Sequence, residues 1–144
     1  MEEKYKFVYQ KVEAMVSEES DPIANMANVS ALLHETFGWW WTGFYRVDGE
    51  SLVLGPFHGP VACTRIPYGR GVCGTAWKRR ETIVVPDVEQ FPGHIACSSL
   101  SRSEIVVPIF KGDAVVGVLD IDSKELSAFD RTDAFWLEKI VALL

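Results

Sequence analysis

The chain has 144 residues, of which 48% are hydrophobic and 24% are charged, and its formal net charge is -6. This length suits one domain with a core of its own, so we expect residues 1–144 to form a single domain. No apolar run approaches the roughly 20 residues of a membrane span, and an acidic chain lacks the basic face that nucleic acids require. The N-terminus shows no signal-peptide pattern, so we expect a cytoplasmic protein that binds neither membrane nor nucleic acid.

The first quarter of the sequence predicts two helices. Apolar residues recur at helical spacing over about residues 3–17, which indicates an amphipathic helix. After a short turn, Asp21 is suited to cap a second helix and Pro22 to occupy its first position. We expect that helix to run to about Thr36 and to be ended by Gly38.

The middle of the chain predicts short strands joined by turns. We expect strands over the β-rich stretches 39–48, 50–57, 62–69 and 81–87. Gly49 separates the first two stretches, which indicates a hairpin. Residues 71–80 follow a glycine-rich turn and predict a short helix. Residues 88–103 have no periodicity and predict a long loop, a kind of segment that is often functional in a compact domain.

The end of the chain predicts another hairpin and a closing helix. Residues 104–110 and 114–122 have the pattern of paired strands, with a turn at Lys111–Gly112 or Lys111–Asp113. Over residues 127–144 we expect a helix, capped by Asp130, whose inward side chains are Phe135, Trp136, Ile140 and Leu143. Helices at both ends and antiparallel strands between them indicate an α+β fold, with one sheet and the terminal helices packed on one of its faces.

Three acidic residues are expected to meet at one end of the last hairpin. With either turn, Glu104 lies opposite Leu119 or Asp120, while Asp120 and Asp122 point to the same face because they are two residues apart. Carboxylates held close together repel, and the pKa of one of them rises. The alternative is that the two aspartates stand in solvent at the end of a strand.

Aromatic residues crowd the first predicted strand. Its alternation places Trp39, Trp41 and Tyr45 on one face, with Trp40 and Phe44 on the other. Most such rings fill a core, but two aromatic faces exceed what one core needs, so one of them is expected to line a pocket. An aromatic wall beside converging acids suits a small ligand with an amine and an apolar tail.

The three cysteines have a spacing unlike that of a zinc ribbon, and their odd number does not suit a structural disulfide framework in a reducing compartment. Cys63, in an apolar stretch, has the character of a small buried side chain. Cys73 lies in the first turn of a helix, where backbone N–H groups lower the pKa of a thiol. Cys97 lies in a polar loop with His94 and Arg102 nearby and is expected to be partly exposed, and no metal site is expected there. Both Cys73 and Cys97 therefore stay open as the reactive thiol.

Four motifs carry a resemblance to a known family. They are "ACTRIPYGRGVCGTAW", "FPGHIAC", "SEIVVPI" and "GVLDIDS". In this order and spacing they resemble the free methionine-R-sulfoxide reductases, which are stand-alone GAF domains, and the resemblance covers nearly the whole chain. It implies a GAF domain with a six-stranded antiparallel sheet. It also implies an oxidoreductase, with a disulfide as acceptor, that reduces free L-methionine-(R)-sulfoxide to L-methionine without a metal or an organic cofactor.

The resemblance also implies roles for single residues. Cys97 corresponds to the nucleophile, Cys63 to the usual resolving thiol, and Cys73 to a third, redox-active or auxiliary thiol. The substrate-binding acids and pocket aromatics correspond to Glu104, Asp120, Asp122, Trp41 and Tyr45. Thioredoxin is the implied reductant, and association into a homodimer stays open. Two other functions stay open as well: a non-catalytic GAF module that binds a small ligand, and a thiol redox sensor with a partner protein.

Overall fold

The structure is a computed structural model, which describes residues 1–94 and 100–144. Its elements in chain order are α1 (Glu2–Glu18), α2 (Pro22–Phe37), β1 (Trp41–Asp48), β2 (Ser51–His58), β3 (Arg65–Pro67), α3 (Gly71–Arg79), β4 (Ile83–Val85), the 3-10 turn η1 (Val88–Gln90), β5 (Ser103–Lys111), β6 (Ala114–Ser123) and α4 (Arg131–Val141). Among the described residues, no helix combines the length and apolar character that a membrane span requires.

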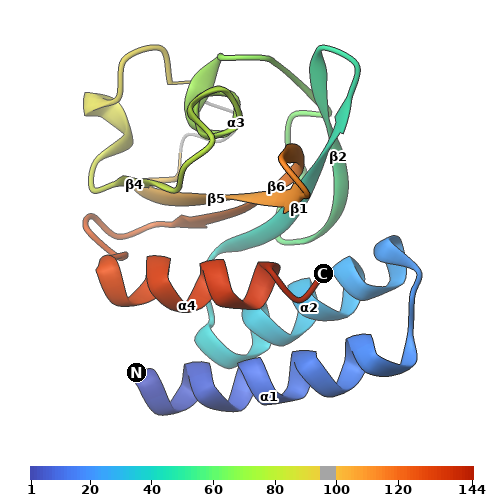
Figure 1. Cartoon of the computed structure of the whole chain (residues 1–144). Helices are drawn as coiled ribbons and strands as arrows, with labels where there is room; N and C mark the ends of the chain where they lie inside the picture. The colour runs from blue at the N-terminus through green and yellow to red at the C-terminus, as the bar shows by residue number, and fades with distance from the viewer. Residues whose placement is uncertain (95–99) are drawn as a thin grey trace.

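One antiparallel sheet of six strands, in the order β3-β2-β1-β6-β5-β4, forms the centre of the molecule. The helices α1, α2 and α4 lie on the same side of this sheet, with α2 and α4 against its face and α1 packed on these two helices, and α3 lies on the other side (Figure 1). The predicted α+β fold, with the terminal helices on one face, is therefore confirmed. The sheet has two covered faces, and each face has a core of its own.

Local capping explains where the helices begin and end. The Asp21 carboxylate accepts hydrogen bonds from the backbone N–H groups of Ile23 and Ala24, and Gly38 ends α2 in the left-handed region at φ +68°. Asp130 and Asp133 form a capping box at the start of α4. The predicted caps at positions 21, 38 and 130 are confirmed.

The inward stripe of α4 differs from the prediction at one position. Phe135 is 55% exposed, whereas Trp136, Leu137 and Ile140 are buried against the sheet. Successive residues of a helix differ by about 100° in direction, so Phe135 and Leu137 point to different sides. Leu143 lies beyond the end of the helix and packs partly against the same core, as expected.

The register of the last hairpin also differs from the prediction. The turn consists of Gly112 and Asp113, with Gly112 in the left-handed region, and an irregularity at Ile109/Phe110 shifts the pairing by one more residue. As a result Glu104 pairs with Asp122, and Val106 pairs with Asp120. Alternation within each strand does not determine how the two strands pair, because a bulge leaves an extra residue of one strand unpaired and shifts every pair beyond it by one.

A buried hydrogen bond joins the first helix to the last. The Tyr5 hydroxyl donates to Asp133 Oδ1 at 2.5 Å, while the Asp133 carboxylate also accepts from the backbone N–H of Asp130 at 2.9 Å. We expect Tyr5→Phe to lower the free energy of unfolding by about 1–3 kcal/mol, because it leaves a buried carboxylate oxygen without its donor. Urea denaturation measures this change.

The matched control for this prediction is Tyr9→Phe. Tyr9 lies on the same helix, and its hydroxyl makes no hydrogen bond within the described part of the chain. Equal unfolding free energies for the two variants would contradict a stabilising role of the Tyr5 hydroxyl.

Candidate active site

A pocket lies on the face of the sheet that α3 covers, at the start of β5 and the end of β6. It is lined by Trp40, Trp41, Tyr45, Pro60, Val61, Ala62, Ile66, Arg70, Gly71, Val72, Cys73, His94, Ser101, Glu104, Asp120 and Asp122. The two predicted aromatics and all three predicted acids are thus in one pocket. Cys73 lines it as well, although it is separated from the acids by some thirty residues or more of sequence.

The strand register places the acids together. Glu104 on β5 pairs with Asp122 on β6, and Asp122 pairs in turn with Trp41 on β1. Asp120 precedes Asp122 by two residues on β6, so it lies on the same face, and it pairs with Gly43. The alternative in which the two aspartates stand in solvent is wrong, because Asp120 is only 6% exposed and Asp122 is partly buried. Glu104 is only 5% exposed.

Burial and mutual repulsion govern the protonation of these acids. Burial is the largest cause that raises the pKa of Glu104, Asp120 and Asp122 above the ordinary carboxyl range. The charge of Asp120 raises the pKa values of the other two further. A cluster of this kind retains protons to higher pH than separate carboxylates do, and it attracts cations.

Glycine at position 43 makes room for the aromatic wall. A Cβ atom there would lie 2.4 Å from Phe57 Cβ and 2.7 Å from the Trp41 ring. The Trp41 ring therefore lies over the backbone of β1, where it stacks on Phe57 with 5.3 Å between ring centroids. A larger residue at position 43 would displace this ring from the pocket.

The two pocket aromatics also hold the chain segment at residues 60–63. The Trp41 indole N–H donates to the carbonyl oxygen of Pro60 at 2.9 Å, and the Tyr45 hydroxyl donates to that of Cys63 at 2.9 Å. Each ring thus presents its apolar surface to the pocket and uses its polar atom to fix the pocket wall. The predicted strand over 62–69 is limited to Arg65–Pro67, so Cys63 lies next to the pocket-lining residues 60–62 and not in a strand.

The prediction of the sheet faces on which Trp39 and Trp40 lie was wrong. Trp39 packs with the helix-side core and stacks on Phe37 at 4.3 Å, whereas Trp40 lines the pocket. Strand alternation begins only at Trp41, where β1 starts, and the bend before it reverses the expected order. The face that lines the pocket therefore carries Trp40, Trp41 and Tyr45.

The reactivity predicted for Cys73 from its place in a helix is not supported. Cys73 is a free, buried cysteine at the start of α3. Burial is the main cause that raises the pKa of its thiol well above the ordinary value, and the charges of Asp120 and Glu104 raise it further. The stabilisation of a thiolate by a helix N-terminus is outweighed here, because the thiolate would be desolvated and would face three acids.

Several pocket residues were not identified from the sequence. Ser101 donates a hydrogen bond to Asp122 Oδ1 at 3.1 Å. His94 Nε2 lies 3.9 Å from Glu104 Oε1, and burial lowers the pKa of this histidine. Both His94 and Ser101 lie in the predicted loop over residues 88–103, and this position is the sequence feature that could have indicated them as site residues. Arg70 is exposed and lines the pocket beside Gly71, and nothing in its local sequence sets it apart from other surface arginines.

Cys97, the predicted nucleophile, lies outside the described residues. On either side of the segment 95–99, His94 and Ser101 both line the pocket. The described residues by themselves form a site with an aromatic wall, buried acids and a thiol. Such a site can bind a small cationic ligand and hold a proton for transfer.

Comparison with known proteins places this site in a family. A model of the GAF domain matches residues 26–144. Together with the six-stranded antiparallel sheet, this defines the chain as a GAF domain. "GAF domain-containing protein A" of Dictyostelium discoideum is 56% identical over 144 residues, which cover 99% of this chain and 91% of that protein.

Two further relatives define the family more closely. The free methionine-R-sulfoxide reductase of Escherichia coli is 47% identical over 132 residues, with 91% of this chain and 80% of that protein covered. The crystal structure of free methionine-R-sulfoxide reductase from Neisseria meningitidis in complex with its substrate is 55% identical, with a TM-score of 0.95, and the match covers 96% of this chain and 84% of that one. The chain belongs to the free methionine-R-sulfoxide reductase family of oxidoreductases.

Proposed function

We propose that this protein reduces free methionine-(R)-sulfoxide to methionine, with Cys97 as the nucleophile and thioredoxin as the final reductant. The observation that carries the proposal is the meeting of Glu104, Asp120 and Asp122 with the aromatic wall in one pocket. The identity of 47% and 55% to proteins of this activity supports it.

The pocket has the groups that a free amino acid sulfoxide needs. The substrate ammonium is a cation and meets buried carboxylates, and Trp41 and Tyr45 offer apolar surface to the side chain. Arg70, which lines the same pocket, offers an opposite charge to the substrate carboxylate. In a peptide the ammonium is replaced by a neutral amide and both charges are lost, so the pocket favours the free amino acid.

The acids also supply the proton that the reaction requires. The Cys97 thiolate attacks the sulfoxide sulfur, and a proton on the sulfoxide oxygen weakens the S–O bond, so that this oxygen can pass to the Cys97 sulfur as a hydroxyl group. Among Glu104, Asp120 and Asp122, a carboxyl group whose pKa is raised by burial keeps its proton to higher pH than an exposed carboxyl does, and it can donate that proton. The oxygen is transferred to Cys97, which becomes a sulfenic acid, and methionine is released.

A second thiol completes the cycle. The Cys63 thiol condenses with the sulfenic acid, so that a disulfide forms and water leaves. The thioredoxin dithiol then reduces this disulfide and is itself oxidised. Cys63 is better suited to this step than Cys73, because it directly follows the pocket-lining residues 60–62 and is only partly buried, whereas the Cys73 thiol is buried and its pKa is raised.

The substrate assay tests the proposal most directly. With dithiothreitol as reductant, we expect turnover of free methionine-(R)-sulfoxide and little turnover of either the S epimer or a methionine-(R)-sulfoxide inside a peptide. Product methionine is measured by chromatography. Equal rates on free and peptide-bound sulfoxide would contradict the proposed role of the acids in binding the ammonium.

Cys63→Ser should separate the first turnover from the cycle. The variant should release about one methionine per protein, because the first step uses Cys97 alone, and should then cycle poorly with thioredoxin. Rapid mixing followed by quantification of methionine measures the first turnover. Cys73→Ser is the matched variant, and a cycling defect confined to that variant would transfer the resolving role to Cys73.

The non-catalytic GAF module that binds a cyclic nucleotide is disfavoured by the charge of the pocket. A phosphate would have to approach three carboxylates, two of which are almost fully buried. Calorimetry with a cyclic nucleotide should therefore detect no binding. Tight nucleotide binding without sulfoxide turnover would favour the binding module instead.

A further inference from the structure

We infer that Cys73, Glu104 and Asp120 bind a thiophilic divalent cation, Zn²⁺ in the first place, and that the bound ion excludes the substrate. Binding of the ion stands on the described residues alone. Only the exclusion of substrate rests on the proposed function.

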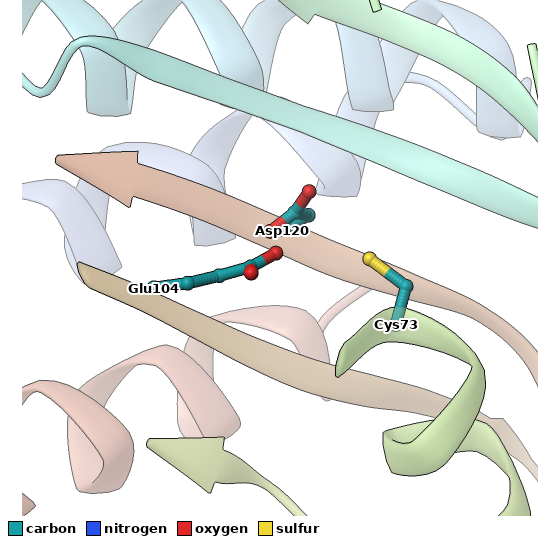
Figure 2. Close-up of side chains that lie close together, drawn as sticks. All are labelled: Cys73, Glu104 and Asp120. Atoms are coloured by element: carbon teal, nitrogen blue, oxygen red, sulfur yellow. The ribbon is translucent and has the colours of Figure 1, made fainter. Parts of the chain in front are cut away.

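The three side chains converge from three different elements. Cys73 from α3, Glu104 from β5 and Asp120 from β6 point toward one another (Figure 2). One ligand atom of each lies within 4.8 Å of the other two. In a tetrahedral zinc site, with Zn–S of about 2.3 Å and Zn–O of about 2.0–2.2 Å, the ligand atoms are about 3.5 Å apart. A movement of about 1 Å, within reach of side-chain rotation, would close the cluster around an ion.

An unsatisfied oxygen is a second, independent sign of a ligand. Asp120 Oδ1 is buried and accepts no hydrogen bond from an amide N–H or an alcohol of the described residues. The Cys73 thiol and the carboxyl groups of Glu104 and Asp122 can donate to Asp120 only while they keep their protons. A buried carboxylate oxygen without a donor is costly, and most such atoms in proteins are paired with a hydrogen-bond donor or coordinate a metal. The opposite residue on β1 is Gly43, which has no side chain that could supply a donor.

The chemistry of the donors selects the metal. Mg²⁺ and Ca²⁺ prefer sites made entirely of oxygen, whereas a thiolate favours Zn²⁺. On binding, the Cys73 thiol loses its proton to solvent, and the ion carries two positive charges into a group of three negative ligands. Three protein ligands leave a fourth position for water. The ion then takes the carboxylates that would otherwise receive the substrate ammonium.

Cobalt spectroscopy tests the site without any use of enzyme activity. We expect Co²⁺, added to reduced and metal-free protein, to produce a thiolate-to-metal charge-transfer band that Zn²⁺ abolishes and Mg²⁺ does not. Cys73→Ser should lose the band and bind Zn²⁺ at least about tenfold more weakly by calorimetry. Cys63→Ser, the matched control, should retain the band.

A second pair of variants guards against a folding defect in Cys73→Ser. Asp120→Asn should weaken Zn²⁺ binding, whereas Asp113→Asn, in the exposed turn between β5 and β6, should leave it unchanged. A Cys73→Ser protein that keeps the charge-transfer band, or equal Zn²⁺ affinity in the two asparagine variants, would overturn the inference.

The effect on activity is a separate measurement. Zn²⁺ should raise the apparent KM for methionine-(R)-sulfoxide and leave kcat nearly unchanged, as expected of a competitor. Normal turnover in a protein that gives no cobalt band would refute the metal site alone. A cobalt band in a protein without turnover would refute the proposed function and leave the metal site standing.

Discussion

Cys97→Ser is expected to lower kcat/KM for free methionine-(R)-sulfoxide by at least about 10³-fold, which corresponds to about 4 kcal/mol of lost transition-state stabilisation. The physical reason is that the substitution removes the proposed nucleophile, the Cys97 thiol. A thiolate is present at neutral pH in useful amounts and attacks soft sulfur, whereas a serine hydroxyl remains protonated and has no base assigned to it. The loss should appear with dithiothreitol as well as with thioredoxin, because it precedes every reductive step.

The measurement is the rate of methionine release from the free R epimer under both reductants. Cys73→Ser serves as the matched comparison, since it removes a thiol from the same pocket. If Cys97→Ser kept substantial turnover and Cys73→Ser lost it, Cys73 would be the nucleophile in spite of the burial that raises the pKa of its thiol. Mass spectrometry with a sulfenic-acid trap on the reacted protein identifies the oxidised residue directly.

Glu104→Gln is expected to lower kcat/KM by about 10²-fold or more, the usual contribution of a positioned acid. In the native protein, burial raises the pKa of Glu104, and Asp120 and Asp122 raise it further. If the cluster donates the proton, activity is present while it is protonated and falls as pH rises through the raised pKa. Glu104 in turn lowers the pKa values of the two aspartates by hydrogen bonding, so Glu104 is the last of the three acids to lose its proton. Glu104→Gln removes that carboxyl, and the aspartates that remain lose their protons at lower pH.

The alkaline limb of the pH–rate profile should therefore move to lower pH in Glu104→Gln. Glu89→Gln is the matched control, because Glu89 is exposed on η1 and the substitution removes the same charge. The control should keep the native profile. An unchanged alkaline limb in Glu104→Gln would mean that the proton comes from a group outside the acid cluster.

The same substitution should raise stability as it lowers activity. A carboxyl whose pKa is higher in the folded than in the unfolded chain stabilises the fold least at high pH, since stability is lost as pH rises toward the folded-state value. Glu104→Gln removes this dependence. Its melting temperature relative to the native protein should therefore increase as pH rises from about 4, the ordinary pKa of a carboxyl group, through the raised pKa of Glu104 in the folded protein, which also separates lost chemistry from lost folding.

Short-range sequence signals determined the helix ends and the strand faces of this protein. Asp21, Gly38 and Asp130 end or begin helices through bonds to residues within four positions, so their roles can be read from the sequence. The common face of Asp120 and Asp122 follows from strand alternation in the same way, since it depends on a spacing of two within one strand. The family motifs added the activity and the residue roles that no periodicity contains.

The tertiary structure decided the features that depend on contacts between distant residues. A bulge set the pairing of Glu104 with Asp122, and alternation could not predict it. The bend before β1 placed Trp40, and not Trp39, in the pocket. Cys73 has the local sequence of an activated thiol, but the protonation of a thiol depends on its solvent and on nearby charges, and these come from β5 and β6. Local sequence therefore determined the elements and the faces, and only packing determined the electrostatics of the site.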